Sequence, residues 1–194
     1  MSKNFSKDIV ITPLPVLIIS TYDKDGVPNA MNAAWGTQCD YSQIIITLSK
    51  HKTTNNLKIK KAFTVSFATP ETMEISDYFG IESGNNVNKI EKAGVKVIKS
   101  DFVDAPIIEN FPLTLECEVA EMQEIDGEYR VIGNIVNMSV DESILTDDKV
   151  DLGKLKPISF DSASNSYRVL GDIIGKAFYD GLKIKNKKIG EYIV

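Results

Sequence analysis

The chain has 194 residues, the length of one domain, and we predict a single domain over residues 1–194. Its composition, with 43% hydrophobic and 25% charged residues, is that of a globular protein without long disordered segments. The formal net charge of -5 argues against nucleic acid as a partner, because proteins bind such polyanions through strongly basic surfaces.

The first predicted strand lies within residues 8–20, where two prolines place the start of pairing near Val16. A turn at residues 23–26 leads into a second strand over residues 27–36, which is unusually small and polar. Small residues let another group approach the backbone and use its amides, so this strand is a candidate ligand surface. The alternative is packing under a helix, which also favours alanine.

The stretch from residue 44 to residue 62 changes from apolar to polar within a few residues. It begins as a β-branched strand at 44–48 and continues as a turn rich in lysine and threonine that leads into a helix. Thr53 or Thr54 is a suitable N-cap, and His51 is either a phosphate contact or a solvated cap. Because the first amides of a helix have no partner within it, the sequence predicts a phosphate site. The alternative is a capped surface helix with a solvated basic turn.

Strands and short helices alternate along the next part of the chain. The pattern predicts, in order, a strand at 63–67, a helix from Pro70 that ends before Gly80, a polar loop at 81–86, a helix at 87–93 stopped by Gly94, and extended chain at 95–98.

The clearest hairpin joins residues 113–123 to residues 129–140 through a turn at Asp126-Gly127. Gly133 interrupts the alternation of its second strand, as a bulge at a barrel corner would. Residues 141–157 have the pattern of a helical turn followed by a loop. About six or seven strands with long antiparallel pairs, and about three short helices, predict a mainly β fold, a β-barrel with helical insertions.

Most motifs of known nucleotide-binding and hydrolytic sites are absent from the sequence. The chain has no G-x-G-x-x-G or G-x-x-x-x-G-K-[ST] phosphate loop and no G-x-S-x-G nucleophile elbow. His51 is the only histidine, which excludes a three-histidine zinc site, and its lysine and threonine neighbours do not suggest a Ser-His-Asp triad. We therefore expect no metal site and no catalytic side chain. A phosphate site without such machinery favours a bound cofactor that supplies the chemistry itself.

Cysteine usage and hydropathy favour a cytoplasmic protein. Cys39 and Cys117 are too few for a disulfide framework or a cysteine-based zinc site, and the alternating strand around Cys117 predicts a buried free thiol. The first ten residues lack the apolar run of a signal peptide, and no segment is long and apolar enough for a membrane helix.

Several blocks of this sequence resemble the flavin reductase-like, FMN-binding split-barrel family, and its flavoredoxins most closely. The block P-N-A-M-x-A-A-W at residues 28–35 is fairly specific, whereas each other block is weak alone. The matching blocks span nearly the whole chain in the right order, at residues 15–20, 26–35, 49–57, 83–89 and 115–117, and at Tyr167 and 170–171.

This resemblance implies a split β-barrel homodimer with one FMN per subunit, held near the subunit interface. It places the phosphate and ribityl chain at the turn and helix start, formed by Leu48, Ser49, Lys50, Lys52, Thr53, Thr54 and Asn55. It places the isoalloxazine edge against backbone groups of Asn29, Ala30, Met31, Asn32 and Ala33, together with Trp35. It makes Ser83, Gly84 and Lys89 a loop over the cofactor or its substrate side, and Tyr167 an aromatic wall.

Some of these residues also suit an ordinary structural role. General aromatic behaviour favours a core or dimer contact for Trp35, and Tyr167 is suited to packing down the apolar tail that follows it. Lys89 belongs to a charge-rich helix, where a solvated face is the common outcome. Two positions depart from the family: Lys52 stands where arginine is frequent, which keeps the charge but loses a bidentate fork, and Asn88 stands where aspartate is usual.

The function that the resemblance implies is that of an FMN-binding oxidoreductase. It would pass electrons from NAD(P)H or another donor through FMN to a small or protein acceptor. One alternative is an FMN-binding electron carrier or flavin-sensing module without NAD(P)H activity. A second is an enzyme like pyridoxamine-phosphate oxidase, which would need arginines for a second phosphate, and this chain has only Arg130 and Arg168.

Overall fold

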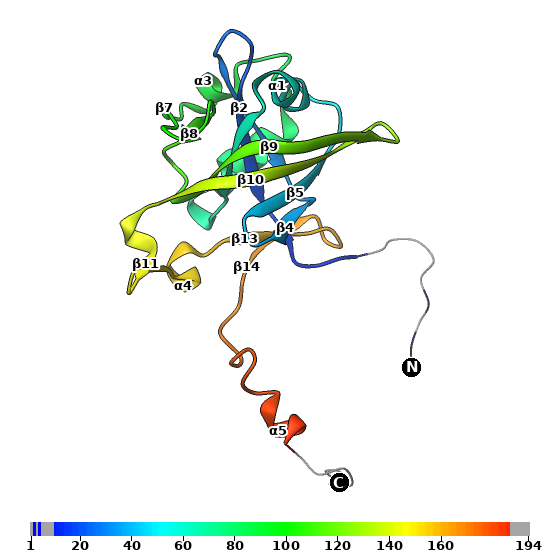
Figure 1. The fold of residues 1–194 in the computed structure, drawn as a ribbon, viewed down its shortest axis with the longest axis vertical. Coiled ribbons are helices and arrows are strands. Elements are labelled where there is room, and N and C mark those ends of the chain that lie inside the picture. Colours follow the sequence, from blue (N-terminus) through cyan, green and yellow to red (C-terminus); the bar gives the residue numbers. More distant parts are fainter. Residues whose placement is uncertain (1, 3, 5–9, 187–194) are drawn as a thin grey trace.

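The computed structural model describes residues 2, 4 and 10–186 and shows a curved antiparallel β structure with short helices around it (Figure 1). Its main sheet has seven strands in the spatial order β3-β2-β6-β9-β10-β5-β4. These strands are β2 Leu17–Tyr22, β3 Pro28–Ala33, β4 Gly36–Asp40, β5 Gln43–Leu48, β6 Ala62–Phe67, β9 Leu113–Ile125 and β10 Glu128–Val140. The prediction of a mainly β fold is confirmed.

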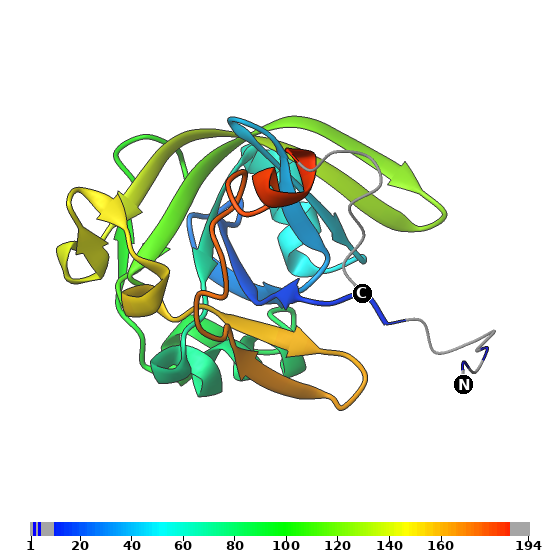
Figure 2. The ribbon, with the colours of Figure 1, turned by 90° about the horizontal axis from the view of Figure 1, so that it is seen from below.

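The main sheet curls around one of its faces but does not close into a complete barrel (Figure 2). Its two terminal strands, β3 and β4, form no ladder with each other in the described part of the chain. The prediction of a β-barrel is therefore corrected to an open, strongly curled sheet. The two terminal strands are nevertheless consecutive in sequence, so the chain crosses from one edge of the sheet to the other within a few residues.

The crossing from β3 to β4 contradicts the prediction of one continuous strand over residues 27–36. The structure interrupts that strand at Ala34 and Trp35. A Cβ atom on Gly36 would lie 2.6 Å from Cγ2 of Ile46 and 2.8 Å from Cδ1 of Leu17. The chain therefore turns against β5 and β2 at a distance that only glycine permits.

Two apolar clusters occupy the two faces of the sheet, as the alternation of side chains along a strand requires. Leu17 of β2 belongs to the first cluster and its neighbour Ile18 to the second. Helix α1 (Lys52–Lys60) contributes Leu57 to the first cluster. Helices α2 (Met73–Ile81) and α3 (Lys89–Ala93) cover the second cluster through Phe79 and Ile90.

The predicted helices exist, but two of their boundaries were wrong. A 3-10 turn at Pro70–Thr72 precedes α2, which continues through Gly80 instead of ending before it. A Cβ on Gly80 would lie 3.3 Å from the Cβ of Asn32, so this glycine permits close packing of α2 on β3 and does not terminate the helix. Helix α3 begins at Lys89, and its left-handed C-cap at Gly94 is as predicted.

The long hairpin of β9 and β10 confirms the sequence prediction, including its bulge. The register between the two strands shifts at Ile132/Gly133. A Cβ at Gly133 would lie 2.4 Å from Cζ of Phe63, so glycine makes room for that ring in the core. Cys117 of β9 is fully buried, and burial together with the neighbouring Glu116 raises the pKa of its thiol to about 12.

Small elements complete the chain. They are β1 Leu14–Pro15, β13 Ile158–Asp161 and β14 Ser166–Val169 in one sheet, β7 Val97–Lys99 with β8 Pro106–Ile108, the 3-10 turn Glu142–Ile144 with β11 Leu145–Thr146 and β12 Lys149–Val150, and helices α4 Leu152–Leu155 and α5 Leu182–Lys185. The predicted run at 8–20 begins at residues 8 and 9, which lie outside the described residues. Across the described chain, each helix is too short or too polar to span a bilayer.

Candidate functional site

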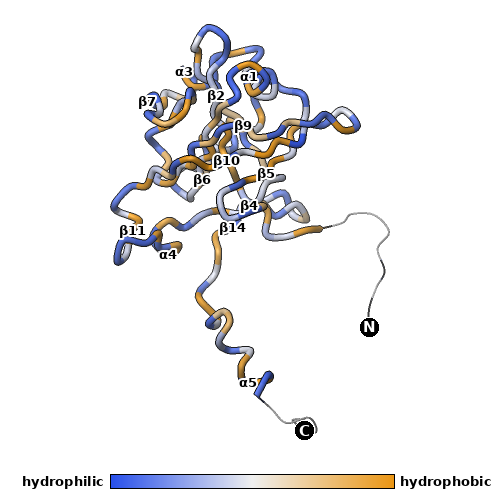
Figure 3. The backbone as a smooth tube through the Cα atoms, in the orientation of Figure 1, coloured by the Kyte–Doolittle hydropathy of each residue, from blue (hydrophilic) through white to orange (hydrophobic). Residues whose placement is uncertain are grey.

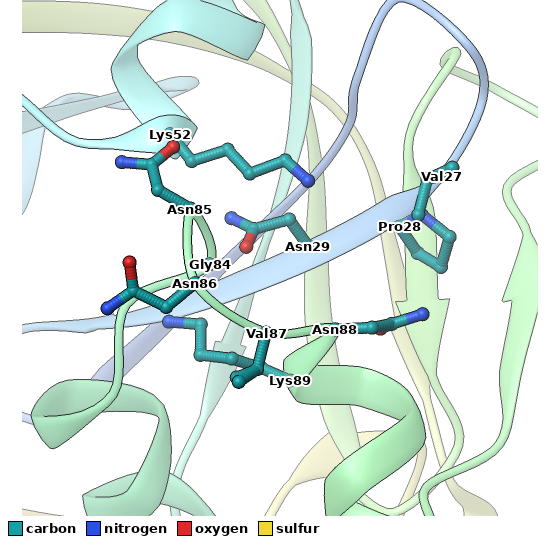
Figure 4. A pocket seen from close by; sticks show the side chains of 10 residues that line it. All are labelled: Val27, Pro28, Asn29, Lys52, Gly84, Asn85, Asn86, Val87, Asn88 and Lys89. Carbon is teal, nitrogen blue, oxygen red and sulfur yellow. The ribbon is translucent and has the colours of Figure 1, made fainter.

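A cavity of about 160 Å³ lies where three segments meet, and we call it the α1 cavity. Its walls come from the start of β3, the start of α1 and the loop that precedes α3 (Figure 4). The lining residues are Val27, Pro28, Asn29, Lys52, Gly84, Asn85, Asn86, Val87, Asn88 and Lys89. At about 30 Å³ per water, this volume corresponds to roughly five waters, which is room for a phosphate group.

The N-terminus of α1 forms one wall of the α1 cavity. His51 is the N-cap residue, with extended backbone angles φ −133° and ψ 173°. Thr54 closes this first turn, since its Oγ1 accepts a hydrogen bond from the His51 amide (2.9 Å) and donates one to the His51 carbonyl (2.7 Å). The prediction of Thr53 or Thr54 as N-cap was therefore wrong, because the helix begins earlier, at Lys52. The first amides of α1 and its dipole favour an anion at this end.

Lys52 supplies the positive charge at this wall. Its Nζ lies 3.3 Å from Oδ2 of Asp23, in the turn between β2 and β3. Burial alone would raise the pKa of Asp23, but the amides of Val27 and Asp25 and the Lys52 ammonium together hold it below its usual value. The carboxylate therefore stays charged at neutral pH and fixes the lysine head group beside the cavity.

Asn29 joins strand, helix and loop from the floor of the α1 cavity. Its side chain is buried, and its Nδ2 donates a 2.9 Å hydrogen bond to Oγ1 of Thr53. A Cβ on Gly84 would lie 2.0 Å from Asn29 Oδ1 and 3.4 Å from Lys52 Cδ. The loop backbone thus approaches Asn29 as closely as glycine allows, which leaves the cavity its space.

Lys89 connects the cavity-lining loop to the end of α2. Its side chain is 4% exposed, so the interpretation as a solvated surface lysine was wrong. Its Nζ donates hydrogen bonds to the carbonyl oxygens of Phe79 (2.9 Å) and Glu82 (3.1 Å) at the end of α2. Burial lowers the pKa of this ammonium to about 8, although Glu82 opposes the shift.

The structure brings only some of the predicted site residues together. Asn29, Lys52, Gly84 and Lys89 line the α1 cavity, and Thr53 supports it through Asn29. Sequence reasoning missed the asparagines at 85, 86 and 88 as lining residues, together with Val27, Pro28 and Val87. The glycine and asparagine content of 84–88 was the available signal, since such runs form loops with accessible backbone.

The remaining residues of the predicted basic turn lie outside the lining. Ser49 is exposed and its hydroxyl donates to the carboxylate of Glu128, at 2.9 Å. Lys50 and Asn55 are exposed, and Leu48 is buried in the first apolar cluster. Ser83 lies just before the cavity wall and its hydroxyl accepts from the amide of Asn85.

The other predicted residues of β3 extend away from the α1 cavity. Ala30 and Ala33 are buried and Met31 is partly buried against the first cluster, while Asn32 donates to the Ser76 carbonyl of α2 (3.0 Å). Trp35 is 67% exposed, so it is not a core residue of this chain. Along this terminal strand, only Met31 and Asn32 of these β3 residues are partly exposed, and the exposed Trp35 follows the end of the strand.

Tyr167 of β14 packs against the second apolar cluster beside Phe160, with ring centroids 6.1 Å apart. Its hydroxyl donates a 2.7 Å hydrogen bond to Oδ1 of Asp77 on α2. Burial and this carboxylate raise the pKa of Tyr167 to about 12. Its observed contacts are those of a residue that ties β14 to α2.

The described part of the chain contains no cluster of metal-ligating side chains. No three His, Cys, Asp or Glu side chains gather there in a way that could hold an ion.

The model of the flavin reductase like domain matches residues 10–154 of this chain. The chain belongs to that family. Among solved structures, the flavoredoxin of Desulfovibrio vulgaris (Miyazaki F) is 33% identical, with a TM-score of 0.88 over 93% of this chain and 100% of that one. A flavoredoxin from Methanosarcina acetivorans is 26% identical, with a TM-score of 0.87 over 95% and 99% of the two chains.

A sequence relative, an uncharacterised protein of Aquifex aeolicus, is 27% identical over 77% of this chain and 81% of its own length. The resemblance that the sequence blocks indicated is confirmed, and membership of this flavin reductase-like family supports FMN as the cofactor. The α1 cavity suits the phosphate of that cofactor, since an ammonium, a helix N-terminus and a loop that has glycine at position 84 meet there.

Proposed function

We propose that this protein is an FMN-dependent oxidoreductase of the flavoredoxin kind, which passes electrons from NAD(P)H or another donor to a small or protein acceptor. The observation that carries the proposal is the α1 cavity, where the Lys52 ammonium and the start of α1 meet a glycine loop in a phosphate-sized space. The family match and the flavoredoxin structure at 33% identity support it.

In this proposal, the α1 cavity holds the FMN phosphate. Lys52 would supply charge, which it would share with Asp23, and the first amides of α1 would donate to phosphate oxygens. Asn29 and Gly84 would set the shape of the cavity. The wider set from the family, namely Leu48, Ser49, Lys50, Thr53, Thr54, Asn55, Ser83 and Lys89, would position these groups or contact the ribityl chain.

The isoalloxazine ring is too large for the α1 cavity and would lie outside it, beside the partly exposed Met31 and Asn32 of β3 and towards Trp35, with Tyr167 as a wall. When bound, FMN supplies the redox chemistry at its ring. The chain's own task is then to bind and orient that ring and to keep one face open to the donor. We further propose that residues 1–194 act as one cytoplasmic domain and that two copies form a homodimer.

An activity like that of pyridoxamine-phosphate oxidase is a weaker alternative, because of where the two arginines of the chain lie. Arg168 is paired with Asp161 at 2.7 Å, and Arg130 lies exposed on β10. Neither arginine lines the α1 cavity.

The first test measures FMN affinity by fluorescence titration of the purified protein. Lys52→Ala should raise the dissociation constant about 10-fold or more, because a hydrogen bond to a charged group contributes about 1.5–3 kcal/mol. Lys61→Ala is the matched control, since Lys61 is an exposed lysine at the other end of the same helix. Equal affinities for wild type and Lys52→Ala would reject the phosphate assignment.

The second test separates an enzyme from an electron carrier. Anaerobic mixing of the FMN-loaded protein with NADH or NADPH should bleach the visible flavin bands if the chain accepts electrons from a nicotinamide. A flavin that stays oxidised with both donors, yet is reduced by dithionite, would reject NAD(P)H as the donor and favour a carrier.

A further inference from the structure

The segment that follows β14 extends away from the rest of the molecule, and we call residues 170–186 the arm (Figure 1). Every residue of the arm is exposed. The hydrogen bonds that it makes within the described chain are internal, such as the one from the Lys176 amide to Oδ2 of Asp180 (2.7 Å). Among the described residues, the arm therefore lacks the tertiary contacts that support the folded body of the chain.

The composition of the arm does not suit a solvated tail. Ile173 is 96% exposed, and Ile174 and Phe178 are fully exposed. Leu170, Tyr179, Leu182 and Ile184 are also exposed, and hydrophobic bands recur along the arm (Figure 3). So many exposed large apolar side chains in one short segment favour an interaction site in a folded protein.

The backbone of the arm also favours a contact between the arm and another surface. Its helix α5 has only four residues, and so short a helix is not stable on its own in water. Phe178 adopts a left-handed φ of 60°, a region that bulky side chains rarely occupy. Both features favour contacts beyond those that the described part of the chain provides.

The body of the chain carries a matching uncovered surface, which we call the β4–β10 patch. Tyr41, in the turn after β4, is 99% exposed, and Val136 and Met138 of β10 are 45% and 48% exposed. The turn and β10 are neighbours, because the Ile135 amide donates to the Ser42 carbonyl (2.8 Å). Trp35, which precedes the other end of β4, is also exposed.

We propose that the arm packs on the β4–β10 patch of a second copy of this chain, and that the two copies exchange arms. The inference rests on the homodimer of the proposed function and names the segment that forms it. A second copy is the occupant that the chain itself supplies, because among residues 10–186 each molecule carries both an apolar arm and an apolar patch that do not meet. When two copies related by two-fold symmetry exchange arms, the arm and the β4–β10 patch of each copy are both covered.

The size of the arm is adequate for a stable dimer. A buried aromatic side chain contributes roughly 150–250 Å². Phe178 and Tyr179 from two arms, together with the aliphatic side chains and the patches that they cover, reach the roughly 1,200–2,000 Å² of a stable interface.

The test compares self-association of the full-length protein and two double variants by sedimentation equilibrium. Wild type should be a dimer, and Ile174→Asp with Phe178→Asp should raise the dimer dissociation constant at least about 100-fold. Ile98→Asp with Phe102→Asp is the matched control, since these side chains are 49% and 60% exposed elsewhere on the surface. The control should dimerise like wild type.

A mixing experiment tests which surface receives the arm. Tyr41→Asp with Val136→Asp should also weaken the dimer, because it damages the patch. An equimolar mixture of the arm variant and the patch variant should recover association, because the heterodimer retains one intact arm and one intact patch.

The outcomes separate this inference from the proposals on which it rests. A dimeric wild type whose arm variant dimerises equally well would overturn the arm exchange and leave the homodimer standing. A monomeric wild type would overturn both, as would a monomer that binds phosphatidylglycerol vesicles through the arm. FMN titration of the same samples tests the cofactor proposal independently.

Discussion

Replacement of Gly84 by alanine should damage the α1 cavity through one identified contact. The new Cβ would lie 2.0 Å from Oδ1 and 3.1 Å from Cγ of Asn29. Gly84 does not have a positive φ, so its backbone is compatible with alanine and the collision alone decides the outcome. Either Asn29 or the loop that carries Gly84 has to move.

The free-energy cost of Gly84→Ala follows from the hydrogen bond that Asn29 makes. If its side chain rotates away, the hydrogen bond to the Thr53 hydroxyl breaks, and both groups are buried, with Thr53 only 1% exposed. A buried polar group left without its partner costs about 1–3 kcal/mol. The free energy of unfolding should fall by about that amount. Because Asn29 or the loop then enters the cavity, the FMN dissociation constant should rise about 10-fold or more.

The assay is a double-mutant cycle read by urea unfolding and by FMN titration. In an Asn29→Ala background the added methyl group no longer meets Oδ1, so Gly84→Ala should cost less than about 0.5 kcal/mol there. Gly171→Ala is the control, since nothing lies within 4 Å of its added Cβ. Additive effects of the two substitutions, or a Gly84→Ala protein that binds FMN as tightly as wild type, would refute the reasoning.

Two further predictions concern a buried lysine and a partly buried tyrosine. Burial lowers the pKa of Lys89 to about 8 from 10.5, so the unfolded chain binds more protons between these values, and the free energy of unfolding should rise by about 1–3 kcal/mol as pH increases from 8 to 10.5. Lys89→Met should flatten this rise in urea unfolding measured across that range, and parallel pH curves would contradict the assignment. Tyr167→Phe removes the hydrogen bond to Asp77 and should cost about 1–2 kcal/mol of unfolding free energy, whereas Tyr41→Phe, at a 99% exposed position, should cost nothing measurable. An equal cost for the two tyrosine variants would show that the bond to Asp77 does not stabilise the fold.

The strands of this protein could be predicted because their pattern is local. The alternation over residues 113–123 and 129–140 and the turn between them contain the whole hairpin, and the structure has it as Leu113–Ile125 and Glu128–Val140. The bulge at Gly133 was also predictable, since a glycine inside an alternating strand is typical of a bulge or a tight bend.

The features that sequence reasoning missed depend on partners far along the chain. Gly36 makes the corner between β3 and β4 because Leu17 and Ile46 crowd it, and nothing in its own neighbourhood signals a turn. Gly80 resembles a helix stop, yet its contact with Asn32 keeps it inside α2. In both cases a tertiary contact overrides the local preference of glycine.

In the candidate site too, local features could be predicted from the sequence, whereas features that depend on distant contacts could not. The positive charge of Lys52 and the presence of a helix after the basic turn are visible in a few consecutive residues, and Gly84 was found through the family resemblance. The burial of Lys89 was not visible, because its partners are carbonyl oxygens of Phe79 and Glu82, and carbonyl groups carry no sequence signal. The N-cap prediction failed because Thr54 satisfies the first turn from inside the helix.

The two cysteines of this chain differ in exposure, so that only one of them can be labelled by a thiol reagent. At mildly alkaline pH the Cys117 thiol, with a pKa of about 12 and no exposed surface, stays protonated and inaccessible to maleimides, whereas Cys39 is exposed on β4. A single spin label or fluorophore would therefore attach at one defined position without any engineering. Because β4 is a terminal strand of the sheet beside the β4–β10 patch, the spacing between two such labels in the proposed homodimer would report directly on how the two molecules face each other.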